Sequence, residues 1–183
     1  LEIEGPNGPR QVRLSSPDRL MWPGAGITKG DLAAYVMAVG DSLVHHIGDR
    51  PVTLQRFPDG IEGEEFYQKN PPKGLPEWVR TVSCRYPSGR RHAQIVIDEV
   101  ASAVWAVQMN TITLHPWPVT VGEDPGLVDR PDEVRLDLDP QPGRDFADVR
   151  VAAHALREVM AEAGLTGFVK TSGNRGVHVF APV

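Results

Sequence analysis

Two aspartates stand one residue apart at the end of an apolar run, "VRLDLDP", residues 134–140. In an extended strand the apolar residues of this run share one face, whereas Arg135, Asp137 and Asp139 share the other. The two carboxylates then lie about 7 Å apart along the strand and repel each other. Magnesium and manganese prefer carboxylate oxygens, and a pair of such ions can clamp a transferring phosphoryl group. The spacing therefore predicts a divalent metal site, although a solvent-exposed strand also accepts this pattern and Arg135 could neutralise the charges.

A glycine-bracketed turn follows one helix downstream, in "KTSGNRGVHVF", residues 170–180. Gly173 and Gly176 permit a tight turn whose backbone N–H groups can approach a phosphate closely. Ser172 and Arg175 add a hydroxyl and a positive charge, and His178 lies on the strand that follows. A turn of this kind is often an ordinary hairpin, but beside the aspartate pair it predicts a triphosphate cradle.

Two further groups carry weaker signals. His115 ends a strand in "LHPWP", where packing is an equally good interpretation. Arg19 and Lys29 flank Trp22 just before an expected helix, and a helix N-terminus attracts anions. These two cations therefore predict a site for a terminal phosphate.

The formal charge of −5 argues against a protein that coats nucleic acid along its whole surface. The segment 69–92 is nevertheless basic, with six cations against the single acid Glu77. The six are Lys69, Lys73, Arg80, Arg85, Arg90 and Arg91. This separation of charge suits a polyanion held on one surface, and a solvated charged face is the alternative.

The single cysteine, Cys84, excludes an intrachain disulfide, and no apolar run approaches the roughly 18 residues of a membrane span. With no secretory leader in view, a reducing cytoplasmic location and no membrane partner are expected.

The apolar periodicity and the turn residues predict an α+β chain with helices on one face of its sheet. Helices are expected over 29–47, 98–109 and 145–164, the first capped by Thr28 with Asp31 and the last by Asp145. Strands are expected at 51–57, 65–70, 111–118, 134–140, 167–172 and 177–183, with a tight turn over 173–176 and a hairpin over 80–97.

Five segments in order, "SSPDRLMWP…ITK", "PVTLQRFPDGIEGEEFYQKN", "LHPWP", "VRLDLDP" and "KTSGNRGVHVF", resemble the polymerase domain of bacterial DNA ligase D. That family belongs to the archaeo-eukaryotic primase superfamily and extends broken DNA ends during non-homologous end joining. The resemblance implies a single primase-polymerase-like α+β domain over 1–183, with a mixed or antiparallel RRM-like sheet flanked by helices. It also implies that the chain is the N-terminal two-thirds of the family domain, with a third catalytic carboxylate beyond Val183.

The resemblance also implies roles for individual residues. Asp137 and Asp139 become catalytic metal ligands, with Mn²⁺ favoured over Mg²⁺. Contacts to a nucleoside triphosphate fall to Ser172, Arg175, His178, His115, Arg56 and Phe66. By the same resemblance, Arg19 and Lys29 would bind the 5′-phosphate across a DNA gap. The residues that would brace DNA ends are Arg85, Arg90 and Arg91. The implied partners are DNA ends or gapped DNA with a 5′-phosphate, nucleoside triphosphates, an end-joining ligase and a Ku-type end-binding protein.

Template-directed nucleotidyl transfer is therefore the leading hypothesis. A DNA-end and nucleotide-binding module without catalysis is the alternative, because only two of the three carboxylates are present. A metal-dependent nuclease or phosphatase would also use the aspartate pair, but it accounts less well for the triphosphate cradle. Some relatives carry a lysine where Gln55 stands here, so the sequence gives Gln55 no ribose contact.

Overall fold

The computed structural model describes residues 1–85, 89–121 and 131–183. The chain divides into two compact units, Leu1–Val128 and Asp129–Val183, and each is described by itself. Both units combine helices with antiparallel strands, which confirms the predicted α+β class.

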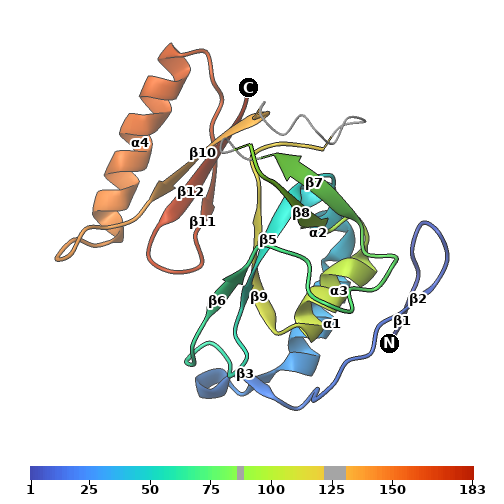
Figure 1. The fold of residues 1–183 in the computed structure, drawn as a ribbon. Coiled ribbons are helices and arrows are strands. Elements are labelled where there is room, and N and C mark those ends of the chain that lie inside the picture. Colours follow the sequence, from blue (N-terminus) through green and yellow to red (C-terminus); the bar gives the residue numbers. More distant parts are fainter. Residues whose placement is uncertain (86–88, 122–130) are drawn as a thin grey trace. The chain divides into compact units, whose positions relative to one another are not determined.

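The first unit is built on a five-stranded antiparallel sheet (Figure 1). Its central strand is β5 (Pro51–Arg56), which pairs with β9 (Thr111–Pro116) along one edge. Along the other edge β5 pairs first with β8 (Arg91–Val96) and then with β6 (Phe66–Gln68). The predicted hairpin is present, because β7 (Thr81–Arg85) pairs with β8 from Thr81 opposite Ile95 to Arg85 opposite Arg91.

The described part of this unit contains three α-helices: α1 (Lys29–Ala38), α2 (Gly40–Ile47) and α3 (Val100–Gln108). The Thr28 hydroxyl accepts the Asp31 N–H at the start of α1, and the Asp31 carboxylate accepts the Thr28 N–H, as the sequence predicts. The prediction of a single helix over 29–47 is wrong, because the helix is interrupted at Val39, between α1 and α2. A Cβ at Gly40 would lie 2.6 Å from Val100, so a close approach to α3 fixes this corner.

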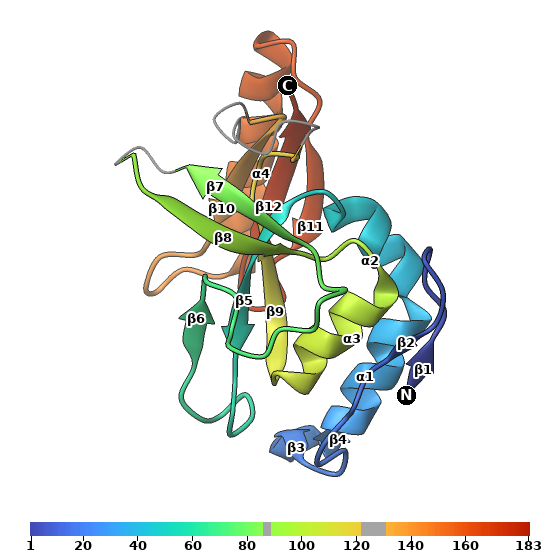
Figure 2. The ribbon, with the colours of Figure 1, turned by 45° about the vertical axis from the view of Figure 1, so that its right-hand side comes forward.

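Helix α3 is apolar on nearly every side. It lies beside α1, as Figure 2 shows, and the two helices pack together. Its residues from Ala101 to Val107 are all buried, and they pack with Val52, Leu54 and Ile95 of the sheet. This apolar layer is the main core of the unit. Consequently one face of the sheet is covered by helices, and the side chains of functional interest distribute between the other face and the ends of α1 and α3.

Short elements complete the first unit before α1. They are the hairpin of β1 (Glu2–Ile3) with β2 (Arg10–Gln11), the pair of β3 (Leu20–Trp22) with β4 (Ile27–Thr28), and the 3₁₀ turn η1 (Pro23–Ala25). The β1–β2 hairpin is fastened by Arg10, which donates to the buried Glu99 carboxylate at 3.0 Å. The segment before α1 is held at the C-terminal end of α3 by a separate hydrogen bond, in which the Ser15 N–H donates to the Gln108 side chain.

The second unit is a three-stranded antiparallel sheet with one helix (Figure 1). The order is β10 (Glu133–Leu138), β12 (Val177–Pro182) and β11 (Phe168–Thr171), and α4 (Phe146–Glu162) connects β10 to β11. The Asp145 carboxylate accepts the Ala147 N–H and caps α4, and Gly164 beyond its end has a φ of 74°. Leu136, Leu138 and Val179 face Met160 and Leu156 of α4 in a small core.

No helix in the described part of the chain is long and apolar enough to cross a membrane.

Candidate functional site

Asp137 lies on the face of the second unit's sheet that is turned away from α4. The predicted alternation holds, since Leu136 and Leu138 pack toward α4 while Asp137 stays 63% exposed. Asp137 is directly opposite His178 in the β10–β12 register, and its Oδ1 lies 3.5 Å from His178 Nε2. On the third strand Lys170 is opposite His178, with its Nζ 3.5 Å from His178 Nδ1. The three strands therefore carry one polar row, Asp137, His178 and Lys170.

Asp139 is next to this row and lies against the backbone of Gly176. A Cβ at Gly176 would lie 2.3 Å from the Leu138 carbonyl oxygen and 2.4 Å from Asp139 Oδ1, so only glycine lets the two chain segments meet. Gly176 therefore serves close approach of the turn to the aspartate pair. Arg135, on the same face, makes an ion pair with Glu133 and stacks on Phe180 at 5.5 Å from the ring centre. Arg135 thus has partners of its own along β10 and β12.

The turn between β11 and β12 is organised by Ser172. Its Oγ accepts the backbone N–H groups of Asn174 at 3.3 Å and Gly176 at 3.1 Å, and its own N–H donates to the Gly176 carbonyl. Gly173 has a φ of 89°, the left-handed conformation that the tight turn requires. Two of the amides that the sequence assigned to a phosphate are therefore directed at Ser172 Oγ. The Ser172 hydroxyl hydrogen, the exposed Arg175 guanidinium and the exposed Asn174 side-chain amide can each donate directly to an anion at this turn.

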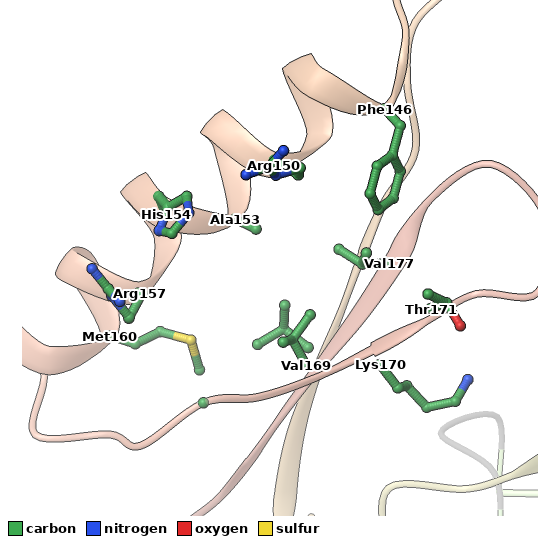
Figure 3. Close-up of a pocket in the computed structure, with 12 residues that line it drawn as sticks. Phe146, Arg150, Ala153, His154, Arg157, Met160, Val169, Lys170, Thr171 and Val177 are labelled. Carbon is green, nitrogen blue, oxygen red and sulfur yellow. The ribbon is translucent and has the colours of Figure 1, made fainter.

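The opposite face of the same sheet contains a pocket of about 440 Å³ between α4 and β11 (Figure 3). Met160, Val169 and Val177 line it, and Arg150 and Arg157 stand along its helical side. Strand alternation places this pocket on the far side of the sheet from Asp137 and His178. The pocket thus lies on the face opposite to Asp137 and His178, and Lys170 of the polar row is also one of its lining residues.

The aspartate pair can bind a hard divalent cation whose remaining ligands are supplied by the substrate. Mg²⁺ and Mn²⁺ are commonly held by one or two carboxylates, with waters and substrate phosphates completing the shell. Asp137 and Asp139 are exposed at the end of their strand and can supply this number of ligands. Across residues 1–85, 89–121 and 131–183, no group of three or more His, Cys, Asp or Glu side chains is placed to hold a metal. The carboxylate pair would therefore depend on further ligands from outside this set.

In the first unit, Arg19, Lys29 and Arg56 form a cluster of three cations. Lys29 is 3% exposed and donates from Nζ to the Gln108 carbonyl at 2.7 Å, while Arg56 donates from Nε to the Met109 carbonyl at 2.6 Å. Both cations thus use the carbonyls at the C-terminal end of α3, where the helix dipole favours positive charge. Burial, followed by the positive charges of Arg19 and Arg56, lowers the pKa of Lys29 to about 8.

No described carboxylate pairs with any member of this cluster, which makes it a candidate anion site. The Arg19 guanidinium donates to the Pro58 carbonyl, and Arg56 also donates to Gln68 at 2.6 Å and stacks on Phe66 at 5.0 Å. Burial lowers the pKa of the Arg56 guanidinium as well. The positive charges of Arg19 and Arg56 repel that of Lys29, and an anion bound among the three would reduce this repulsion.

The first backbone N–H groups of α1 already donate within the chain, so the helix N-terminus can act on a bound anion only through its dipole. The Lys29 N–H donates to the Arg19 carbonyl and the Gly30 N–H to the Pro17 carbonyl, both at 2.8 Å. The Asp31 N–H is taken by the Thr28 hydroxyl. Recognition of an anion here therefore falls to the side chains of Arg19, Lys29 and Arg56.

His115 lies on the face of the sheet opposite to the helices, and the structure brings it together with residues that the sequence did not single out. Its Nε2 lies 3.0 Å from Gln55 Oε1, and Gln55 Nε2 donates to Glu65 at 2.6 Å. The Tyr67 ring is 5.4 Å from the His115 ring. Gln55 and Arg56 are adjacent in sequence, but they point to opposite faces of β5, so Arg56 and Phe66 belong with Lys29 and not with His115.

Arg85 and Arg91 face each other across the predicted hairpin of β7 and β8, and Arg90 precedes β8. All three side chains are exposed. Like charges directly opposite each other destabilise a strand pair, so this end of the hairpin favours an anionic partner.

Lys170 and Gln55 are the functional candidates that the sequence reasoning missed. A signal for Lys170 was available, because counting back across the turn from Thr171 opposite Val177 puts Lys170 opposite His178. No comparable signal existed for Gln55, whose partners come from β9 and from the loop before β6.

Comparison with known proteins places this geometry in a family. The sequence model of the LigD primase-polymerase domain matches residues 28–183. The chain belongs to the LigD primase-polymerase domain family. This confirms the family that the five sequence segments resemble.

The relatives are multifunctional non-homologous end joining proteins. The chain is 35% identical over 173 residues to the multifunctional non-homologous end joining protein LigD of Pseudomonas aeruginosa, and 30% identical over 178 residues to LigD of Mycobacterium tuberculosis. These matches cover 94% and 95% of this chain but only 20% and 23% of the relatives. The chain therefore spans less than a quarter of the length of either LigD protein.

A solved structure gives the same fold. The polymerase domain of Mycobacterium tuberculosis ligase D in complex with DNA matches with a TM-score of 0.85 at 29% identity, over 94% of this chain and 61% of that one. The α+β architecture of a LigD polymerase domain is thus shared by this chain. That neighbour binds DNA.

Proposed function

We propose that this chain is part of a template-directed nucleotidyltransferase that extends a primer and fills gaps at DNA ends during non-homologous end joining. Membership of the LigD primase-polymerase family supports the reaction class. The observation that carries the proposal is the polar row of Asp137, His178 and Lys170 beside Asp139, on a sheet face that no helix of its unit covers.

The reaction is the attack of a primer 3′-hydroxyl on the α-phosphate of a nucleoside triphosphate. A new oxygen–phosphorus bond forms, the bond between the α-phosphate and the bridging oxygen breaks, and pyrophosphate leaves while the hydroxyl proton passes to solvent. Asp137 and Asp139 would hold a divalent cation, Mn²⁺ in our proposal, which when bound neutralises charge that develops on the transferring phosphoryl group. The triphosphate oxygens would complete its ligand set, which suits a site that offers two carboxylates.

The remaining residues of the second unit would bind and orient the triphosphate. Ser172 can donate its hydroxyl hydrogen, and Arg175 offers a planar set of donors at the exposed turn. His178 lies next to Asp137, Lys170 lies next to His178, and both can donate to phosphate oxygens from the same sheet face. These contacts would stabilise pyrophosphate as it separates.

The first unit would recognise DNA. Arg19, Lys29 and Arg56 form a cation cluster without a described carboxylate partner, which supports binding of the 5′-phosphate at the far side of a gap. The facing arginines Arg85 and Arg91, with Arg90, support contact with the phosphate backbone of a DNA end. An end-joining ligase and a Ku-type protein are the partners that the family suggests for the larger assembly.

Primer extension tests this proposal. The chain is incubated with Mn²⁺, labelled nucleoside triphosphates and a gapped duplex that carries a 5′-phosphate. Nucleotide addition is expected, and Asp137→Asn and Asp139→Asn should each lower it by at least about 100-fold, since each removes a charged ligand.

Binding is measured beside extension, because the chain spans less than a quarter of the length of the LigD relatives. Manganese-dependent nucleotide binding that both variants abolish would support the site even where extension is slow. Nucleotide and DNA binding that survive both changes, with no extension by the parent chain, would replace the enzyme with a binding module.

A further inference from the structure

The open face of the first unit's sheet holds a directed hydrogen-bond chain from Glu65 through Gln55 to His115. Gln55 Nε2 and Glu65 Oε2 are 2.6 Å apart, and Gln55 Oε1 and His115 Nε2 are 3.0 Å apart. Gln55 is the middle link and lies on the central strand β5, opposite Thr113 of β9 and Tyr67 of β6. Its position is therefore fixed by strand pairing on both edges.

The chemistry of the three groups fixes the direction of the chain. An ionised carboxylate only accepts, so Gln55 must present its NH₂ group to Glu65. Its carbonyl oxygen then faces His115, and a carbonyl oxygen also only accepts. His115 Nε2 must therefore carry a hydrogen. The charge of Glu65 thus determines, two links away, which ring nitrogen of His115 is the donor.

We propose that Gln55 and Glu65 are positioning residues that hold His115 in its Nε2–H form and so set the hydrogen bonds that the ring offers to a nucleotide. The functional half of this inference rests on the proposed nucleotidyl-transfer activity. Tyr67 supports the arrangement, because its ring centre lies 5.4 Å from that of His115 and restricts rotation of the imidazole. The same logic orients metal-bound histidines, where the partner of one nitrogen fixes the state of the other.

The test reverses the polarity of the chain. A lysine at position 65 only donates, so in Glu65→Lys the Gln55 amide must turn its oxygen to the lysine and its NH₂ group to His115. The ring must then accept at Nε2 and carry its hydrogen on Nδ1. Simple loss of the chain would be a weaker test, because a free imidazole also favours the Nε2–H form.

The measurement is the nitrogen spectrum of ¹⁵N-histidine-labelled chain, about two pH units above the usual imidazole pKa of about 6.5 so that the rings are neutral. His115 is assigned by its absence from His115→Gln. The parent should show the Nε2–H pattern and Glu65→Lys the Nδ1–H pattern. The double variant Gln55→Glu with Glu65→Lys should restore Nε2–H, because a carboxylate at 55 accepts from both neighbours.

Glu64→Lys is the matched control, with the same charge change one residue away. Glu64 is exposed, and in the described part of the chain no hydrogen bond joins it to Gln55. It should leave the His115 spectrum unchanged. An unchanged tautomer in Glu65→Lys, or the same change in Glu64→Lys, would overturn the positioning role.

Nucleotide kinetics test the functional half. Glu65→Lys should raise the KM for the nucleoside triphosphate up to about tenfold with little change in kcat, since one hydrogen bond of substrate binding is lost. The double variant should recover the parent KM. A switched tautomer with an unchanged KM would refute the nucleotide contact. A parent chain that shows the expected spectra but adds no nucleotide would refute the proposed function and leave the positioning role intact.

Discussion

Recognition of a 5′-phosphate by this chain should weaken between pH 7 and pH 9 because of one buried lysine. Lys29 is 3% exposed, donates to the Gln108 carbonyl at 2.7 Å and has the cations Arg19 and Arg56 as neighbours. Burial and these charges lower its pKa to about 8. The proposed phosphate site thus contains a group whose charge disappears close to neutral pH.

The size of the effect follows from the protonated fraction of Lys29. With a pKa of about 8, the ammonium form makes up about 90% of the chain at pH 7, 50% at pH 8 and 10% at pH 9. A phosphate monoester is a dianion throughout this range, since its second pKa is about 6. If only the ammonium form binds the phosphate, affinity should fall about tenfold between pH 7 and pH 9.

The stability of the fold should change in the opposite sense. The pKa of Lys29 is about 8 in the folded chain and 10.5 as the ordinary value, so the unfolded chain binds more protons between these limits. The contribution of Lys29 to the free energy of unfolding therefore rises from about pH 8 to pH 10.5. Weaker phosphate binding at pH 9 would consequently not reflect unfolding caused by this residue.

The assay is fluorescence anisotropy with two gapped duplexes that differ only in a 5′-phosphate or a 5′-hydroxyl. The ratio of their affinities isolates the phosphate contact from other titrations. Lys29→Arg keeps its charge over the whole range and should show a flat ratio, while Lys29→Met should show a low ratio at every pH. A parent ratio that stays constant from pH 7 to pH 9, or an arginine variant that declines like the parent, would refute this account of the site.

Three other substitutions test separate parts of the structure. Gly176→Ala should lower the free energy of unfolding by about 1–3 kcal/mol, measured in urea, because its Cβ would lie 2.3 Å from the Leu138 carbonyl oxygen; no loss would show that the turn can move aside. Asp145→Ala should cost about 1 kcal/mol in the same measurement through loss of the α4 cap, and an unchanged midpoint would mean that the cap contributes nothing. Arg56→Gln should lower the preference for a 5′-phosphate and leave the nucleotide KM unchanged, since it contacts the end of α3 beside Lys29; a raised KM with an unchanged preference would move Arg56 to the nucleotide site.

Local patterns predicted much of the fold, because strand alternation and helix capping depend on a few neighbouring residues. Thr28 with Asp31 and Asp145 mark the starts of α1 and α4 as expected. The alternation of "VRLDLDP" correctly put Leu136 and Leu138 against a helix and Asp137 in solvent. The break at Val39 could not be predicted in this way, since it depends on the approach of Gly40 to Val100, 60 residues away in sequence.

The grouping of the candidate site residues required pairing between distant strands. Asp137 and His178 are 41 positions apart and meet because the β10–β12 register places them opposite each other. A register shift of one residue would turn His178 to the α4 face and leave Asp137 beside a valine. The sequence contained both side chains, but their contact depends on which strand pairs with which and in what register.

Strand alternation also separates chemistry that the sequence places side by side. Gln55 and Arg56 are neighbours on β5, yet the first joins His115 on the open face and the second joins Lys29 at the ends of the helices. A single strand therefore serves two sites of opposite character, a hydrogen-bond chain that runs from the Glu65 carboxylate to an imidazole and a cluster of cations without a described carboxylate partner. Because the two side chains share a backbone and not an environment, substitutions at 55 should change nucleotide kinetics and those at 56 should change phosphate recognition. A variant at either position that altered both properties equally would mean that β5 transmits a backbone displacement from one face to the other.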